Sequence, residues 1–349
     1  MRPVAFVYPG DIEARTGGYG YDRRLVAELS ARGHEVNLVS LDGAFPDPGP
    51  ADIEAALARL SAIAPDHAII VDGLAFGTLP AAALAGLAAP IVALVHHPLA
   101  LETGLDPARA DTVAATERAA LTKAAHVVVT SPHTRDTLVA DYGVPQGAIT
   151  VAIPGLDPGW RQATMRRPVH PPRIVSVASI LPRKGFDTLT AALAAIADLD
   201  WQADFVGSTE RAPETVAALK AQIEAAGLQD RIRLHGEAEE DAIRALYREA
   251  SVFALASRYE GFGMVFAEAM ASGLPIVATR GGAIPDVVPP AAGRLVDVDD
   301  AGAFAAALRA ILTDPALATR LSEGAAEMGR SFQGWPRTGT LVSDALEAL

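Results

Sequence analysis

Ser257–Asp286, SRYEGFGMVFAEAMASGLPIVATRGGAIPD, is the stretch of sequence that decides the fold. It follows the apolar run Val252–Leu255, and its residue types predict a glycine turn, a helix, a second apolar strand and a second glycine turn. Two carboxylates bracket the first turn, because Glu260 stands just before it and Glu268 lies in the helix that follows. Apolar strands joined through helices are typical of a parallel α/β sheet.

The first glycine turn has the features of an anion-binding site. A helix N-terminus carries unpaired N–H groups and a partial positive charge, so it attracts phosphate. Gly261 and Gly263 lack a Cβ atom, which lets the backbone come close to a ligand. Helical side chains tilt toward the N-terminus, which returns Glu268 toward the same place, and carboxylate oxygens suit a pair of vicinal hydroxyls. The turn favours a nucleotide-sugar; the alternative is an ordinary glycine turn with solvated glutamates.

The alternation of apolar strands and amphipathic helices runs through the rest of the chain, with one interruption. That interruption is Pro154–Pro172, whose five prolines predict a linker. We therefore expect two α/β domains, residues 1–154 and 173–330, joined by a linker at 155–172 and followed by a helical segment at 331–349. The first helix is expected from about Gly20 to Arg32. Strands are expected at Val4–Tyr8, Val36–Leu41, His67–Val71, Ile91–Val95, His126–Thr130, Ala148–Ile153, Arg173–Ala178, Trp201–Val206, Arg231–Leu234 and Val252–Leu255.

Composition limits the kinds of partner that the chain can have. Its 349 residues, half of them hydrophobic, are enough for two domains with real cores. A formal charge of −13 argues against nucleic acid and does not indicate contact with anionic membranes. There are no cysteines, which excludes disulfides and thiolate chemistry. The start predicts a strand rather than a signal peptide, and the uncharged stretch Gly73–Val95 is broken by prolines, so we expect a cytoplasmic protein.

The segment around the two glutamates closely resembles the signature of retaining glycosyltransferases of the GT-B fold, of the family 4 type. Seven residues separate Glu260 from Glu268, with E-G-F-G at the front, E-A-M-A in the helix and Gly273-Leu274-Pro275 before the next strand. The resemblance implies two Rossmann-like parallel-sheet domains facing a cleft. It places the acceptor on the first domain and the nucleotide-sugar donor on the second, with the last helix crossing back to the first domain.

The same resemblance implies roles for residues of the second domain. Lys184 would hold the donor diphosphate, Glu260 the sugar hydroxyls and Glu268 the ribose. The family has an arginine where this chain has Ser179, and the neighbouring Arg183 is expected to point elsewhere, although it could compensate. Ser208 and His235 resemble positions near the nucleotide base. The remaining donor-binding positions follow the glycine turn: Gly261, Phe262, Gly263, Met264 and Val265.

In the first domain, Gly17-Gly18 matches the family's glycine loop, which contacts the donor diphosphate or the acceptor. An ordinary helix start is the alternative. The resemblance places a histidine near the sugar after strand Ile91–Val95, which we assign to His97 with His96 as the alternative. From the residues alone, a structural histidine that caps a loop is the simpler interpretation.

The expected activity is transfer of a hexose from a nucleoside diphosphate sugar to a hydroxyl acceptor, with the anomeric configuration retained. Glycan, lipid and small-molecule acceptors all stay open. No metal and no cofactor are expected, because the acidic pairs Asp198–Asp200 and Asp297–Asp299 are predicted to be solvated. The alternatives are a nucleotide-sugar epimerase of the same fold and a catalytically weak donor-binding partner subunit, the latter suggested by Ser179.

Overall fold

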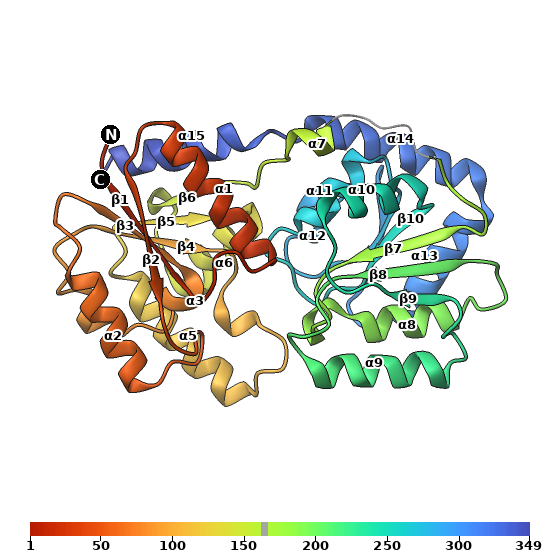
Figure 1. The fold of residues 1–349 in the computed structure, drawn as a ribbon, viewed down its shortest axis with the longest axis horizontal. Helices are drawn as coiled ribbons and strands as arrows, with labels where there is room; N and C mark the ends of the chain where they lie inside the picture. The colour runs from red at the N-terminus through yellow and green to blue at the C-terminus, as the bar shows by residue number, and fades with distance from the viewer. Residues whose placement is uncertain (162–166) are drawn as a thin grey trace. The chain divides into compact units, whose positions relative to one another are not determined.

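The computed structural model describes residues 1–161 and 167–349, and they form two compact units (Figure 1). Unit 1 comprises Met1–Gly155 together with Gly334–Leu349, and unit 2 comprises Leu156–Gln333. Residues 162–166, which fall within the expected linker, lie outside the described residues. Each unit contains one six-stranded sheet whose strands all pair in parallel.

The sheet of unit 1 has the order β2-β1-β3-β4-β5-β6. The strand order reverses between β1 and β3, and the carboxyl ends of strands at such a point form the usual ligand-binding edge. Strands β1, β3 and β4 are buried along their whole length, as expected for a parallel sheet covered on both faces. The strands are β1 (Val4–Pro9), β2 (Val36–Leu41), β3 (Ala68–Asp72), β4 (Ile91–Val95), β5 (His126–Val129) and β6 (Ile149–Val151).

Helices surround this sheet, and the first begins earlier than the sequence predicts. Helix α1 spans Gly17–Ala31 rather than starting at Gly20, because Thr16 caps it by accepting a hydrogen bond from the Tyr19 N–H at 3.1 Å. The glycine pair Gly17-Gly18 is therefore the first turn of the helix. The other helices of unit 1 are α2 (Pro50–Ser61), α3 (Gly73–Phe76), α4 (Ala81–Leu84), α5 (Pro107–Leu121), α6 (Pro132–Tyr142) and α15 (Trp335–Glu347).

The sheet of unit 2 has the order β12-β11-β10-β7-β8-β9, so its reversal lies between β7 and β10. Both strands are followed by the loops that the sequence singles out, Ser179–Gly185 and Ser257–Gly263. The strands are β7 (Arg173–Val177), β8 (Gln202–Val206), β9 (Ile232–Leu234), β10 (Val252–Leu255), β11 (Ile276–Thr279) and β12 (Gly293–Val296). The helices are α7 (Pro158–Arg161), α8 (Phe186–Ala194), α9 (Pro213–Ala225), α10 (Glu240–Glu249), α11 (Met264–Ala271), α12 (Ile284–Val287), α13 (Ala301–Thr313) and α14 (Pro315–Ser331).

The first part of the expected linker belongs to the core of unit 2. Leu156 and Trp160 are buried there, and the Trp160 ring lies 5.4 Å from the ring of Tyr247. Helix α7 provides Trp160, so proline density at this point marks a short helix as well as a connection.

The last helix, α15, packs against α1 in unit 1 and closes its core. Trp335 meets the ring of Tyr21 edge to face at 5.5 Å, and the Thr338 hydroxyl donates to the Ile153 carbonyl at 2.7 Å. The Arg2 N–H donates to Glu347 at 2.9 Å, so the two ends of the chain lie side by side (Figure 1). Unit 1 is therefore assembled from both ends of the sequence.

The described residues contain no single helix that is both long and apolar enough to cross a membrane. Helices α13 and α14, which meet at a bend of 100°, pass that test of length and composition only when they are taken as a pair.

Candidate functional site

The loop after β7 brings Lys184 to the edge of the unit 2 sheet. Its last turn, Pro182–Lys184, ends at Gly185, whose φ of 62° lies in the left-handed region. A Cβ atom on Gly185 would lie 1.9 Å from the Ala256 carbonyl oxygen, so only glycine fits against strand β10. This close approach places the loop directly beside the turn that carries Glu260.

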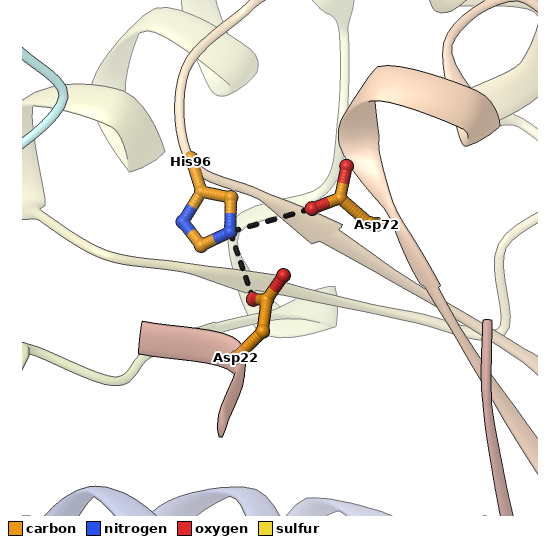
Figure 2. Close-up of side chains that lie close together, drawn as sticks. All are labelled: Asp22, Asp72 and His96. Carbon is orange, nitrogen blue, oxygen red and sulfur yellow. Dashed lines mark hydrogen bonds and ion pairs between the residues drawn. The ribbon is translucent and has the colours of Figure 1, made fainter. Parts of the chain in front are cut away.

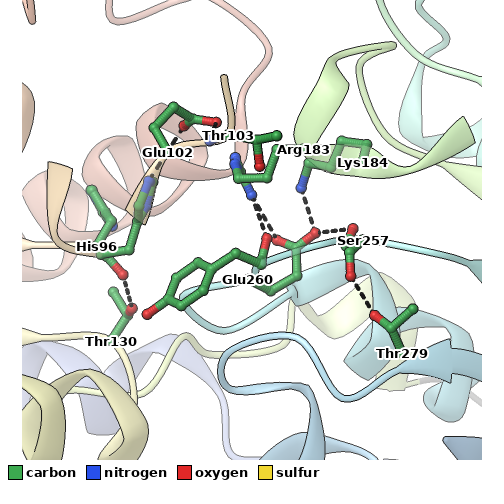
Figure 3. Close-up of polar contacts among 11 residues, drawn as sticks. His96, Glu102, Thr103, Thr130, Arg183, Lys184, Ser257, Glu260 and Thr279 are labelled. Atoms are coloured by element: carbon green, nitrogen blue, oxygen red, sulfur yellow. Dashed lines mark hydrogen bonds and ion pairs between the residues drawn. The ribbon is translucent and has the colours of Figure 1, made fainter. Parts of the chain in front are cut away.

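Glu260 is buried, and three donors surround its carboxylate (Figure 3). The Lys184 ammonium and the Ser257 hydroxyl each donate to Oε1 at 2.6 Å. The Arg183 guanidinium lies 3.6 Å from Oε2 and also donates to the Tyr259 carbonyl at 2.7 Å. The expectation that Arg183 points away is wrong, since its guanidinium lies beside the same carboxylate as the Lys184 ammonium.

These partners fix the charge of the cluster. Burial alone would raise the pKa of Glu260, but the charges of Lys184 and Arg183 and the hydrogen bonds from Lys184 and Ser257 together lower it below its ordinary value. Glu260 is therefore an ionised acceptor at neutral pH. Two cations therefore lie against one buried carboxylate at the edge of the sheet, an arrangement that suits an anionic ligand.

Glu268 has the opposite environment, although it belongs to the same stretch. It lies in α11, which begins after Gly263 at a φ of 87°. Burial, together with the nearby carboxylates of Glu240 and Asp157, raises the pKa of Glu268 to about 8. Within the described ranges, the Glu268 side chain makes no hydrogen bond or ion pair. It is therefore a half-buried acid whose acceptor oxygens are available to a ligand.

Ser208 and His235 follow β8 and β9, at the same edge as Lys184, and both are tied to the protein. The Ser208 carbonyl accepts from Ile180 N–H at 2.9 Å, which links it to the Lys184 loop. His235 Nε2 lies 2.6 Å from Oδ1 of Asp204, a buried carboxylate that was not predicted from the sequence. Asp204 is the one acidic residue in the otherwise largely apolar strand β8, and this is the feature of the sequence that could have identified it.

In unit 1 the structure separates the two histidines that follow β4. His97 Nε2 lies 3.5 Å from Glu102, whereas His96 Nε2 lies 3.0 Å from Asp22 and 3.6 Å from Asp72 (Figure 2). Asp22 comes from α1 and Asp72 from the end of β3, and both are fully buried. Neither aspartate was predicted from the sequence, although Asp72 directly follows the apolar run His67–Val71 in the way that the histidines follow Ile91–Val95.

The glycine loop after β1 packs beside this cluster. A Cβ atom on Gly18 would lie 3.5 Å from the His96 ring, while Gly17 begins α1. Tyr21 belongs to the core, because its ring packs on Trp335 and its hydroxyl donates to the Ala152 carbonyl at 2.8 Å. The Tyr19 hydroxyl donates to the Pro9 carbonyl. Both tyrosines thus have structural roles.

Acidic clusters in the described residues are accounted for by protein partners. Asp198 pairs with Arg309 at 2.5 Å, and Asp297 pairs with Arg280 at 3.1 Å. The oxygens of Asp22 and Asp72 and the His96 nitrogen lie within 4.8 Å of one another, a spacing that could also accommodate a small cation. The His96–Asp22 hydrogen bond accounts for this group without an ion.

Two family models match consecutive parts of the chain. Glycosyltransferase Family 4 matches residues 21–160, and Glycosyl transferases group 1 matches residues 162–328. A D-inositol 3-phosphate glycosyltransferase of Xylanimonas cellulosilytica is 32% identical over 233 residues, which cover 62% of this chain and 55% of the relative. An MMP alpha-(1->4)-mannosyltransferase of Mycolicibacterium hassiacum is 29% identical and covers 85% of this chain and 74% of the relative. The chain spans about half the length of the first of these curated relatives.

Solved structures share the fold from end to end. Sucrose-phosphate synthase from Thermosynechococcus elongatus has a TM-score of 0.81 at 23% identity and covers 100% of this chain and 99% of that one. Anabaena HepE, solved in complex with UDP and glucose, has a TM-score of 0.76 at 18% identity over the whole of both chains. With the two models matching nearly all of residues 21–328, the chain belongs to the family 4 type of glycosyltransferases with the GT-B fold.

Proposed function

We propose that the protein transfers a hexose from a nucleoside diphosphate sugar to a hydroxyl acceptor and retains the anomeric configuration. The observation that carries the proposal is the pairing of two cations, Lys184 and Arg183, with the single buried carboxylate of Glu260. These cations lie where β7 and β10 diverge, which is the ligand edge of a doubly wound sheet.

A diphosphate leaving group gathers negative charge as its bond to the sugar breaks. Preorganised cations stabilise such charge most effectively where they need not move to reach it. Glu260 holds Lys184 and Arg183 in place before the donor binds. The backbone of Gly261–Gly263 can approach the phosphates closely, and Phe262, Met264 and Val265 would line the start of α11. In this proposal Arg183 supplies the positive charge that the family's arginine provides at the position of Ser179 in this chain.

Glu268 is proposed to accept hydrogen bonds from the ribose hydroxyls. A half-buried carboxylate without protein donors gains stabilisation when a ligand supplies them, which favours binding of a diol over binding of a second anion. Ser208 and His235, on the neighbouring strand ends, are proposed to lie near the nucleotide base.

Retention is proposed to proceed on one face of the sugar, without a covalent enzyme intermediate. Both oxygens of Glu260 are engaged by Lys184, Ser257 and Arg183, so this carboxylate is a poor nucleophile. The same cations provide the positive charge that a metal supplies in other transferases, so neither a metal nor another cofactor is part of the proposal.

The names of the relatives suggest which acceptors and donors to test first. One is named for D-inositol 3-phosphate and another as a mannosyltransferase, and HepE was solved with UDP and glucose. We therefore propose a polar hydroxyl acceptor and test UDP-, GDP- and ADP-sugars as donors.

The experiment begins with thermal unfolding in the presence of each nucleotide-sugar, followed by transfer assays with the stabilising donor. We expect one nucleotide class to raise the melting temperature and a product whose anomeric coupling constant matches that of the donor. Conversion of the donor alone into an isomer would instead identify an epimerase. Donor binding without transfer to any acceptor of a broad panel would identify a donor-binding partner subunit.

A further inference from the structure

Arg258, in the loop after β10, contacts the turn after β7 that carries the two proposed phosphate-binding cations. Its backbone N–H donates to the Arg183 carbonyl at 2.7 Å. Its guanidinium donates to the Pro182 carbonyl. These two carbonyls belong to the two residues that directly precede Lys184, so the path of the chain into Lys184 is held by a residue from another strand end.

Two carboxylates accept from the same guanidinium. Both oxygens of Asp187, in the first turn of α8, are engaged, at 3.2 Å and 2.7 Å, and Asp299, in the loop after β12, lies 2.8 Å from Nε. All three guanidinium nitrogens therefore have acceptors, which fixes the orientation of the planar group. Only 21% of the Arg258 side chain is exposed, so solvent screens these pairs less than it screens a fully exposed pair.

Asp299 has an uncommon backbone conformation at this contact. Its φ of 61° lies in the left-handed region, and among the residues that the structure describes it is the one non-glycine residue with a positive φ. Its Oδ1 accepts from the Thr188 hydroxyl at 3.1 Å as well as from Arg258. Strain of this kind persists where surrounding contacts compensate for it, and it clusters at functional sites. The loop after β12 thus keeps a strained conformation that holds its carboxylate against Arg258.

A role in capping α8 does not account for this arrangement. An aspartate in the first turn of a helix is stabilised by the helix dipole without any cation beside it. Arg258 adds two contacts to backbone carbonyls outside the helix, next to the residue whose ammonium lies 2.6 Å from Glu260 (Figure 3). The contacts therefore favour a role in placing Lys184 over a role in helix stability.

We propose that Arg258 is a positioning residue for donor binding, which fixes the turn Pro182–Lys184 so that both of its cations are in place before the diphosphate arrives. The inference deepens the proposed function and rests on it for the identity of the ligand. The charge of Arg258 stays on Asp187 and Asp299, so Arg258 acts through the turn rather than by contact with the phosphates. A ligand that meets cations already in place loses less free energy to reorganisation.

Lysine NMR on the full chain tests the positioning without any assay of activity. The chain has three lysines, of which Lys123 and Lys220 are exposed, whereas Lys184 is 16% exposed and paired with Glu260. In protein labelled with 13C at the lysine Cε, the Lys184 signal is assigned by its loss in Lys184→Met. We expect this signal to lie apart from the other two in wild type. Coincidence of all three signals would show that Lys184 is not held, and the proposal would fail.

Arg258→Met tests the cause of the positioning. We expect the Lys184 signal to move toward those of the exposed lysines, because the turn before it loses its side-chain contacts. The double variant Asp187→Asn/Asp299→Asn serves should Arg258→Met not fold, since asparagine tolerates the left-handed region and Arg258 stays in the chain. It should move the signal in the same direction and by less. A Lys184 signal that stays in place in either folded variant would overturn the proposal.

Arg280→Met is the matched control. Arg280 also forms an ion pair with an aspartate after β12, because it lies 3.1 Å from Asp297, and both side chains are exposed. This variant loses the same charge from the same edge of the sheet and should leave the Lys184 signal unchanged. A shift as large as that in Arg258→Met would mean that loss of charge, rather than loss of the contacts to the turn, moves the signal, and would contradict the assignment.

Donor binding then tests the function. Once a nucleotide-sugar is known to bind, Arg258→Met should weaken its affinity roughly 10- to 100-fold, as measured by calorimetry, and should leave the KM of the acceptor unchanged. Unchanged donor affinity in a variant whose Lys184 signal has moved would show that the turn does not govern binding, against the proposal. If no nucleotide-sugar bound wild type, the proposed function would fail, while the lysine signals would still decide whether Arg258 positions the turn.

Discussion

At the scale of single residues, the two glutamates of one short stretch differ in charge at neutral pH, because Glu260 is ionised and Glu268 is largely protonated. Glu260 is buried beside two cations, which lower its pKa and keep it ionised. Glu268 has no cation beside it to offset the effect of burial, so its pKa is raised. Environments that move the pKa values of two similar acids apart are common in sites where each acid has its own role. The spacing of Glu260 and Glu268 in the sequence identified both residues, but only their neighbours in the fold distinguish them.

The Lys184–Glu260 pair offers a double-mutant cycle. Lys184→Met should lower the free energy of unfolding by about 3 kcal/mol, because it removes one partner of a buried ion pair. Lys184→Met/Glu260→Gln should recover most of that loss, since the uncompensated charge is gone, and should remain inactive. Denaturant unfolding measures the first effect and donor binding the second. A double variant as unstable as the single one would show that the pair is not coupled.

Glu268→Gln should stabilise the protein in alkaline solution while it weakens donor binding. The folded-state pKa of Glu268 is raised to about 8, so the stability associated with its protonated form is lost as the pH rises through that value. The variant should therefore gain about 1 to 3 kcal/mol over wild type at pH 9 and almost nothing at pH 4. Melting temperatures across this range check the sign, and a gain that is larger at pH 4 would contradict it.

At the scale of elements, the alternating hydrophobic pattern predicted every strand but β12 (Gly293–Val296) and predicted the ends of elements less well. Helix α1 starts earlier than expected because the Thr16 side chain caps it, and a cap depends on one hydrogen bond. The segment at Trp160 was predicted as linker because proline count outweighed a single aromatic residue. Asp22 and Asp204 escaped notice since a buried acid leaves no periodic pattern; its partners lie far away in the sequence.

Gly185 is the element-scale test of the site. Gly185→Ala would place a Cβ atom 1.9 Å from the Ala256 carbonyl oxygen and displace the loop that carries Lys184. Gly227→Ala is the matched control, because Gly227 has a φ of 67° and nothing within 4 Å of the added atom. Both variants should lose about 1 to 2 kcal/mol to backbone strain. Only Gly185→Ala should also lose more stability and donor affinity, as measured by calorimetry; equal behaviour would refute the packing argument.

At the scale of the whole molecule, unit 1 depends on a helix that comes from the far end of the sequence. Helix α15 supplies Trp335 to the core beside Tyr21, and His34 Nε2 lies 2.8 Å from the Ser343 hydroxyl. Unit 2 uses none of these contacts, because it is built from Leu156–Gln333 alone.

Deletion of residues 334–349 should therefore affect the two units differently. Hydrogen exchange should lose protection throughout Met1–Gly155 and keep it in unit 2, and Trp335→Ala should produce the same pattern with a cost of about 3 to 5 kcal/mol. Mass spectrometry of peptides after exchange resolves the two units. Equal loss of protection in both would show that unit 2 also needs the helix.

The path of the chain through unit 1 also sets an order of events on the ribosome. Met1–Gly155 is synthesised before unit 2, yet its partner α15 emerges only after every residue of unit 2 has been made. Domains commonly fold in the order of their synthesis. Here the second unit can complete its core while the first still waits for its closing helix, so the part of the protein that starts first is finished last.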